Sequence, residues 1–433
     1  MSGLDELRVP PPVQTPDEED GRGSAHPGRP SAELHLEDEP VDSDENFEVG
    51  EDSAQGPNQQ PRTDAAKPSK SHKLLTELYI ISHLIFFSLL GTLARLGIQW
   101  LTFYPGAPVT TSVLWANVGG SYVMGFLSED RQLFQFPASL QKPNMTSADT
   151  KAQHAKHKKT IPLYIGLATG FCGSFTSFSS FMRDAFLALS NDLPSPLSHP
   201  IPANTAPPNL STTHPRHNGY SVLSLLAVLL YEPALSLCAL YVGAHTALLL
   251  DRATPSISPR TNCLLDRLAL PLGFGAWLAA LLIAIFPTNP SWRGEVLFAL
   301  VFAPLGTLLR FYASLRLNPV AKSFPLGTFA VNVFGSAVLG MAFDLQRVRI
   351  RGLTGGSVAG CQVLQGIEDG FCGCLTTVST WVAEIQGLRR RHAYRYALVS
   401  MAAGMAVMVL IMGSVRWSVG WNLPICVTSR TSS

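Results

Sequence analysis

Long apolar stretches alternate with short polar or charged stretches from residue 78 to residue 415. A helix needs roughly 20 mostly apolar residues to cross a membrane. This pattern predicts an all-α polytopic membrane protein with about nine spans. The expected spans are residues 78–101, 109–127, 161–189, 220–249, 264–286, 295–314, 326–344, 361–387 and 396–415.

One pattern of two neighbouring spans occurs twice, 215 residues apart. In the first copy a Gly-x-x-x-Arg motif ends at Arg95, and Asn117 follows 22 residues later. In the second copy the same motif ends at Arg310, and Asn332 follows at the same distance. A helix, a turn and a second helix have therefore been duplicated without a change in length.

Four spans make up each repeat, and the fifth span stands alone between them. One extra span inverts the second repeat relative to the first, so we expect two inverted four-helix repeats, a common way to build a pathway at the membrane midplane. The expected domains are a disordered acidic tail (1–72), the first repeat (75–250), a linker with the inverting helix (251–290), the second repeat (293–420) and a C-terminal tail (421–433).

Charge is divided unevenly along the chain. Residues 1–70 contain 17 acidic and 6 basic residues, and Phe47 is their single aromatic residue, a composition that cannot bury enough apolar surface to fold. The rest of the chain is basic, and cytoplasmic loops are enriched in Lys and Arg. The N-terminus is therefore expected in the cytoplasm and the C-terminus outside. The loops that support this orientation are 128–160, 250–264, 315–325 and 388–395.

One group of charges disagrees with this orientation. Arg347, Arg349 and Arg351 would lie outside the cell.

The third and eighth spans share a motif of glycines three residues apart, followed by a run of hydroxyl side chains. Such a segment makes a poor continuous helix, so we expect both helices to break at membrane depth, where freed carbonyl groups must be buried or line a cavity. The alternative is that the small residues simply allow close helix packing. The motif positions are Gly170, Gly173 and Thr176 in the first repeat and Gly370, Gly373 and Thr376 in the second.

Together, the Gly-x-x-x-Arg helix, the asparagine in a glycine-rich helix and the broken third helix resemble the CrcB/Fluc fluoride channels. Two such units joined by one extra span resemble the fungal and plant FEX branch of that family, over roughly residues 75–420. The resemblance implies a passive, fluoride-selective channel in the plasma membrane that exports fluoride from the cytosol and confers fluoride resistance. It implies a monomer equivalent to a two-subunit bacterial channel, with no enzymatic activity, nucleic-acid partner or organic cofactor.

The resemblance also assigns roles to individual residues. Asn117 and Asn332 fall on the family's pore asparagine, whose amide N–H groups donate hydrogen bonds to dehydrated fluoride. Arg95 and Arg310 fall on an arginine near the pathway mouth that attracts anions.

The family's two pore phenylalanines fall on Phe178 and Phe181, whose ring edges can line an anion path. The second repeat has Val378 and Trp381 instead, a small side chain and an obstructing one. We therefore expect the two pathways to be inequivalent, and the sequence leaves open whether one or both conduct.

The remaining site residues lie in the two expected breaks. Hydroxyl groups there are expected as further hydrogen-bond donors along the pathway, although Ser and Thr in membrane helices often bond their own backbone. They are Ser179, Ser180, Thr377, Ser379 and Thr380. The family's structural sodium ion would be held by backbone carbonyls of Gly173, Thr176, Gly373 and Thr376.

Glu232 lies within the fourth span, where a carboxylate is costly and is a functional candidate. It could accept a proton in a coupled transporter, lie in a water-filled mouth or pair with an arginine. A proton-coupled antiporter of small ions or drugs is therefore the alternative function.

The seven cysteines fall mostly inside or beside apolar runs and are expected to act as small buried hydrophobes.

Overall fold

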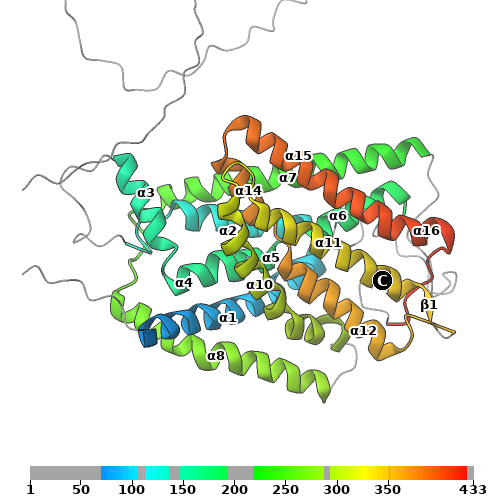
Figure 1. Ribbon diagram of the computed structural model, residues 1–433, viewed down its shortest axis with the longest axis horizontal. Coiled ribbons are helices and arrows are strands. Elements are labelled where there is room, and N and C mark those ends of the chain that lie inside the picture. The colour runs from blue at the N-terminus through cyan, green and yellow to red at the C-terminus, as the bar shows by residue number, and fades with distance from the viewer. Residues whose placement is uncertain are drawn as a thin grey trace, which may run out of the picture. The chain divides into compact units, whose positions relative to one another are not determined.

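The computed structural model describes residues 70–102, 113–135, 147–193, 218–286, 293–350 and 352–426, with single residues between the first two ranges at 104, 107, 109 and 111. These residues are mainly helical and belong to one compact unit, Lys67–Ser433 (Figure 1). The expected acidic tail lies outside the described residues except for its last three.

The helices of the two halves follow the same order. The first half contains α1 (Lys70–Thr102), α2 (Leu114–Glu129), α3 (Ser147–Lys158), α4 (Pro162–Ile165), the π-helical η2 (Gly166–Cys172), α5 (Gly173–Phe175), α6 (Phe178–Ser190) and α7 (Asn218–Leu249). The linker helix is α8 (Pro259–Ile285). The second half contains η3 (Arg293–Leu297), α10 (Phe298–Leu317), the 3-10 turn η4 (Asn318–Val320), α11 (Leu326–Arg347), strands β1 (Arg349–Ile350) and β2 (Leu353–Thr354), α12 (Val358–Gly366), η5 (Ile367–Cys372), α13 (Gly373–Leu375), α14 (Ser379–Gly387), α15 (Arg390–Met408), η6 (Val409–Gly413) and α16 (Ser414–Ser418).

Within the described residues, six helices are long and apolar enough to cross a membrane. They coincide with the first, fourth, fifth, sixth, seventh and ninth expected spans. The second expected span corresponds to α2, which has 16 residues, and the third and eighth are interrupted helices. The all-α polytopic class is confirmed, and the total of nine spans stays a prediction.

The linker helix α8 packs against helices of both halves. Towards α1, a Cβ at Gly273 would collide with the backbone carbonyl of Ser82, so the small residue permits close approach. Towards α10, the indole N–H of Trp277 donates to the carbonyl of Val301 at 2.9 Å. The opposite face carries exposed leucines such as Leu278, as expected for a surface that faces lipid.

The two halves exchange the ends of their third helices. The α6 helix of the first half packs against α11 and α15 of the second, and α14 of the second packs against α2 and α7 of the first. At one such contact, Gly404 on α15 leaves room for Phe178 and Met182 of α6. Each half therefore completes the other's helix bundle, which makes the halves mutually dependent.

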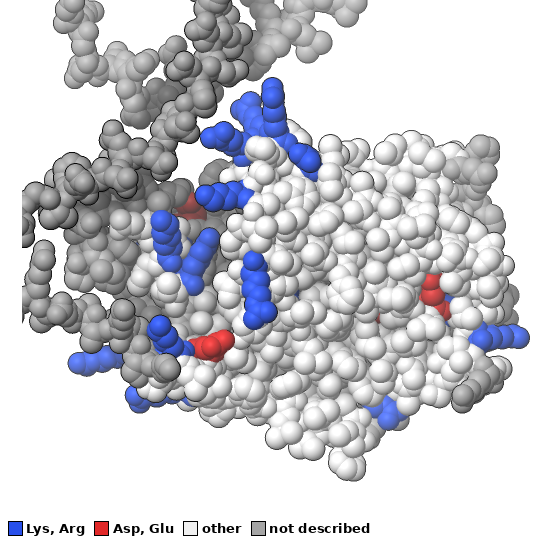
Figure 2. Space-filling model, in the orientation of Figure 1, with Lys and Arg blue, Asp and Glu red and all other residues white. Residues whose placement is uncertain are grey.

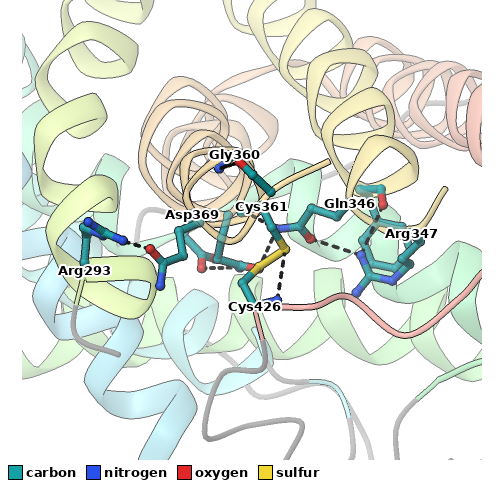
Figure 3. Close-up of a disulfide and its surroundings, with 11 residues drawn as sticks. Arg293, Gln346, Arg347, Gly360, Cys361, Asp369 and Cys426 are labelled. Atoms are coloured by element: carbon teal, nitrogen blue, oxygen red, sulfur yellow. Dashed lines mark hydrogen bonds between the residues drawn. A yellow bond between two sulfur atoms is a disulfide. The ribbon is translucent and has the colours of Figure 1, made fainter. Parts of the chain in front are cut away.

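The C-terminal segment is fastened to the second half by a disulfide between Cys361 and Cys426, whose Cα atoms are 5.7 Å apart. The expectation of a small buried hydrophobe is wrong for these two bonded cysteines and for Cys238 and Cys263, which are exposed. Figure 3 shows Gln346 beside this bond, donating to the Cys361 carbonyl at 3.0 Å. The indole N–H of Trp421 adds a hydrogen bond to Asp344 at 2.8 Å. This segment is thus cross-linked to the ends of α11 and α12.

Candidate functional site

Both third helices break where the sequence predicts. Thr176 has an extended backbone (φ −96°, ψ 152°) between α5 and α6, and Thr376 has nearly the same conformation (φ −94°, ψ 152°) between α13 and α14. A π-helical segment, η2 or η5, precedes each break by one short helix. The duplicated motif therefore produces the same interruption twice.

Asn117 and Asn332 cap these breaks. The Asn117 Oδ1 atom accepts a hydrogen bond from the backbone N–H of Ser177 at 2.9 Å. The Asn332 Oδ1 atom accepts the equivalent bond from Thr377, also at 2.9 Å. Both asparagines are fully buried. Each predicted pore asparagine thus has a structural role at the break of its own repeat.

These caps free backbone carbonyl groups. In a continuous helix the N–H of Ser177 would donate to the carbonyl of Gly173, and that of Thr377 to the carbonyl of Gly373. The asparagines divert both donors. Two carbonyls predicted to bind sodium therefore lose their usual helical partner.

Three residues later, a second backbone N–H in each break donates to a side chain instead of to a helical carbonyl. The N–H of Ser180 donates to Ser177 Oγ at 3.2 Å, and the N–H of Thr380 donates to Thr377 Oγ1 at 3.4 Å. These donors would otherwise reach the residues four positions earlier. The carbonyls released by both diversions are those of Gly173, Thr176, Gly373 and Thr376.

The two breaks contact each other through reciprocal hydrogen bonds. Thr176 Oγ1 accepts from the N–H of Ser379 at 3.2 Å, and Thr376 Oγ1 accepts from the N–H of Ser179 at 3.0 Å. Ser379 Oγ also donates to the carbonyl of Cys172 at 3.1 Å. Such an exchange of equivalent contacts is the signature of two-fold symmetry. Of the predicted hydroxyl residues, Ser179, Thr377 and Ser379 therefore join the two repeats, whereas Ser180 and Thr380 bond within their own break.

Arg310 extends from its own repeat into the other. Its Nε–H donates to the carbonyl of Cys374 at 2.9 Å, and an Nη2–H donates to the carbonyl of Thr169 at 2.9 Å. A Cβ at Gly173 would collide with the same guanidinium group. The absence of a side chain at this motif glycine thus makes room for the arginine.

Arg95 makes the symmetry-related contacts. Its Nε–H donates to the carbonyl of Ser174 at 3.0 Å, and its Nη2–H donates to the carbonyl of Asp369 in the other repeat. Arg95 and Arg310 are both buried. The expectation of a charge at an open mouth is therefore corrected: the arginines lie inside the protein because carbonyl groups around the breaks accept their hydrogen bonds.

The aromatic residues of the motif form one buried group. The ring of Phe178 meets Phe181 edge-to-face at 5.7 Å between centroids and Trp381 at 5.4 Å. Because of the helix exchange, α6 carries the phenylalanines against α11, the helix of Asn332. Conversely, α14 carries Trp381 against α2, the helix of Asn117. The structure thus combines residues from both repeats on each side.

Glu232 lies against Asn117. The Asn117 Nδ2 group donates to Glu232 Oε2 at 3.0 Å, and the carboxyl group is buried. Its placement in a water-filled mouth or beside an arginine is therefore wrong. The second asparagine differs, because Asn332 Nδ2 donates to the backbone carbonyl of Thr377 at 3.2 Å.

Another hydrogen-bonded carboxyl group, the half-buried Glu384, was not anticipated. Glu384 accepts hydrogen bonds from Thr328 Oγ1 at 2.6 Å, Tyr396 Oη at 2.7 Å and Asn318 Nδ2 at 3.2 Å. An acidic residue within the expected span 361–387 was the available signal. Its three donors come from α11, α15 and η4, which a linear motif cannot reveal.

The chain is similar in sequence to known proteins. The family model described as CrcB-like protein, Camphor Resistance (CrcB), matches residues 82–197 and 297–414. The chain is 51% identical over 390 residues to fluoride export protein 1 of Neurospora crassa, covering 84% of this chain and 71% of that protein. It is 34% identical over 347 residues to fluoride export protein 1 of Candida albicans, covering 79% and 81% of the two chains.

A bacterial relative matches about a quarter of the chain. The chain is 31% identical over 123 residues to the fluoride-specific ion channel FluC of Acinetobacter baylyi, covering 27% of this chain and 88% of that protein. No solved structure matches the chain. Because the family model matches both repeats, the chain belongs to the CrcB-like family, in its eukaryotic fluoride export branch.

Proposed function

We propose that this protein is a passive, fluoride-selective channel that exports fluoride from the cytosol and confers fluoride resistance. Its fungal relatives are named fluoride export proteins, and its bacterial relative is named a fluoride-specific ion channel. The observation that carries the proposal is the pair of asparagine-capped breaks joined by reciprocal hydrogen bonds. Hydrogen fluoride enters from an acidic exterior and dissociates inside, and the negative interior potential then drives fluoride out.

The conducting pathway in this proposal runs past Asn332 and the phenylalanines of α6. An amide nitrogen carries two N–H donors, so Asn332 can bond the Thr377 carbonyl and still donate to an anion. The ring edges of Phe178 and Phe181 offer weak positive contacts, which suit an ion that must also leave. The pathway beside Asn117 has Trp381 in place of phenylalanine, and we assign it no conduction.

The breaks fit the structural sodium ion that the family resemblance implies. The proposed ligands are the carbonyls of Gly173, Thr176, Gly373 and Thr376. Uncharged oxygen atoms suit a hard monovalent cation, and the described residues contain no group of three or more His, Cys, Asp or Glu arranged to hold a metal. When bound, sodium would supply positive charge that holds the two breaks together.

Two ends of the molecule support an orientation with the C-terminus outside. Figure 2 shows that most Lys and Arg residues on the visible face gather towards the end that carries α3, which we place in the cytoplasm. Helix α12, which carries Cys361 of the Cys361–Cys426 disulfide, lies towards the other end in Figure 1, and disulfides persist in oxidising surroundings. The guanidinium of Arg347 lies 3.3 Å from the ring centroid of Phe343, so this disagreeing charge has a packing role.

The location that fits fluoride export is the plasma membrane, with the N-terminus in the cytoplasm. A single chain would suffice, because its two repeats supply both halves of the reciprocal contacts. We therefore propose a functional monomer in the lipid bilayer.

Efflux from liposomes that contain the purified protein tests this function. With a potassium ionophore present to set the potential, we expect rapid loss of fluoride and retention of chloride. Loss of both anions at equal rates would contradict selectivity. Fluoride loss only under an imposed proton gradient, abolished by Glu232→Gln, would favour the antiporter instead.

A further inference from the structure

The side-chain N–H group of Asn117, the first pore asparagine, donates a hydrogen bond to a carboxyl group of the protein itself. Asn117 Nδ2 lies 3.0 Å from Glu232 Oε2, and their exposed fractions are 0% and 1%. The two residues lie on α2 and α7, which pack along each other. The hydrogen bond is thus inside the first repeat and shielded from solvent.

The second repeat lacks this arrangement. Asn332 caps its break as Asn117 does, but its Nδ2 group donates to a backbone carbonyl of that same break. A carboxylate is a stronger acceptor than a carbonyl, and it engages the Asn117 N–H donor that an anion would need. The two asparagines therefore accept equivalent hydrogen bonds through Oδ1 but donate through Nδ2 to different groups.

Other polar groups on the same two helices have unused hydrogen-bonding capacity. Ser121 lies one turn beyond Asn117 on α2, and Ser236 lies one turn beyond Glu232 on α7. In the part of the chain that the structure describes, both hydroxyl groups and Glu232 Oε1 are buried without a hydrogen-bond partner. Trp381 lies on the α14 helix, which packs against α2 and α7. Its indole N–H is also buried without a hydrogen-bond partner among the described residues. The contact between α2 and α7 is therefore polar around Asn117 and Glu232, as an ion pathway would be, although a carboxyl group occupies its central donor.

We infer that the Glu232 carboxyl group takes the place of fluoride at Asn117 and thereby closes the first pathway. This inference rests on the proposed channel function. A group tethered to the site competes at a high effective concentration, so dilute fluoride would rarely displace it. An ionised carboxylate would also repel an approaching anion.

The test uses the full-length protein with its second pathway disabled. The parent carries Asn332→Asp and Trp381→Phe, the latter to remove the bulky indole. Adding Glu232→Ser removes the tethered carboxyl group. Adding Glu232→Gln is the matched control, because the glutamine oxygen can still accept from Asn117.

The serine variant is expected to release fluoride from liposomes at least about tenfold faster than its parent, while the glutamine variant stays at the parent level. Fluoride is also expected to raise the thermal midpoint of the serine variant alone, because ligand binding to the native state stabilises it. Either change confined to the serine variant supports the inference. Absence of both changes, or equal changes with glutamine, overturns it.

Two further measurements make the outcome decisive. Size-exclusion chromatography establishes that each variant is folded, and Glu232→Ala replaces the serine variant if that one aggregates, with the same expectations. Wild-type protein is measured in parallel. A wild type that does not release fluoride overturns the channel proposal itself, whereas a conducting wild type without gain in the variant overturns only the role of Glu232.

Discussion

Replacing Asn332 by aspartate is the sharpest perturbation of the proposed conducting pathway. The substitution keeps the shape of the side chain and the oxygen that accepts from Thr377 N–H at 2.9 Å. It removes the donor that lies 3.2 Å from the Thr377 carbonyl and places an acceptor against an acceptor. An unmet buried hydrogen bond of this kind costs about 1–3 kcal/mol.

The effect on fluoride is larger than the effect on folding. An ionised aspartate about 4 Å from a fluoride ion repels it by about 4 kcal/mol at an effective dielectric constant of about 20. Since about 1.4 kcal/mol corresponds to a factor of ten, we expect fluoride efflux to fall at least roughly a hundredfold. The purified variant should still be monodisperse, because the cap on the break remains.

Liposome efflux measured with a fluoride electrode checks this expectation, with Asn117→Asp as the matched variant. In Asn117→Asp the new carboxyl group faces Glu232, so thermal stability should fall, but efflux should remain at least several-fold above that of Asn332→Asp. Fluoride efflux of Asn332→Asp within threefold of the wild type would refute the assignment. The reverse order of the two variants would show that the first pathway conducts.

Three other substitutions, two of them with a control substitution, examine the breaks, the aromatic group and the disulfide. Gly373→Ala forces a Cβ into the guanidinium group across the interface and should lower stability by about 1–3 kcal/mol, whereas Gly97→Ala, with nothing within 4 Å, should be neutral or slightly stabilising in a thermal-shift assay. Phe178→Ile should reduce fluoride efflux roughly two- to tenfold by removing a ring edge, and Phe186→Ile, equally buried on α6 but outside the motif, should not. Cys361→Ser opens a cross-link across 65 residues and should cost up to about 4 kcal/mol, and a reducing agent should lower the thermal midpoint of the wild type but not of this variant.

Local features of the site could be predicted from the sequence because each has a local cause. Glycines followed by hydroxyl residues disfavour a continuous helix, and the breaks at Thr176 and Thr376 follow. The equal spacing of the arginines and asparagines predicts a duplicated unit, and both halves make the same capping bonds. Apolar length alone marks six of the long helices.

Contacts between distant segments could not be predicted in this way. The sequence places Arg95 and Arg310 near the asparagines but does not show that backbone carbonyls of the opposite repeat accept their hydrogen bonds. Cys361 and Cys426 are 65 residues apart, and no spacing rule pairs them. For Glu232, the cost of a carboxylate within a membrane span identifies an unusual residue, but the neighbour that hydrogen-bonds it comes from another helix.

Because the two halves exchange the ends of their third helices, residues that differ between the repeats are not placed beside the asparagine of their own repeat. If each repeat formed its own pathway, Phe178 and Phe181 would belong with Asn117, and the first pathway would retain the family's residues. The fold instead carries these phenylalanines on α6 to the α11 helix of Asn332, and carries Trp381 on α14 to the α2 helix of Asn117. The helix of the second asparagine thus packs against the helix that carries both phenylalanines. The helix of the first asparagine packs against the helix that carries Trp381, and Asn117 itself is hydrogen-bonded to a carboxyl group. Substitutions in both repeats therefore fall on the same pathway, so one route can lose its function while the other keeps a complete set of residues.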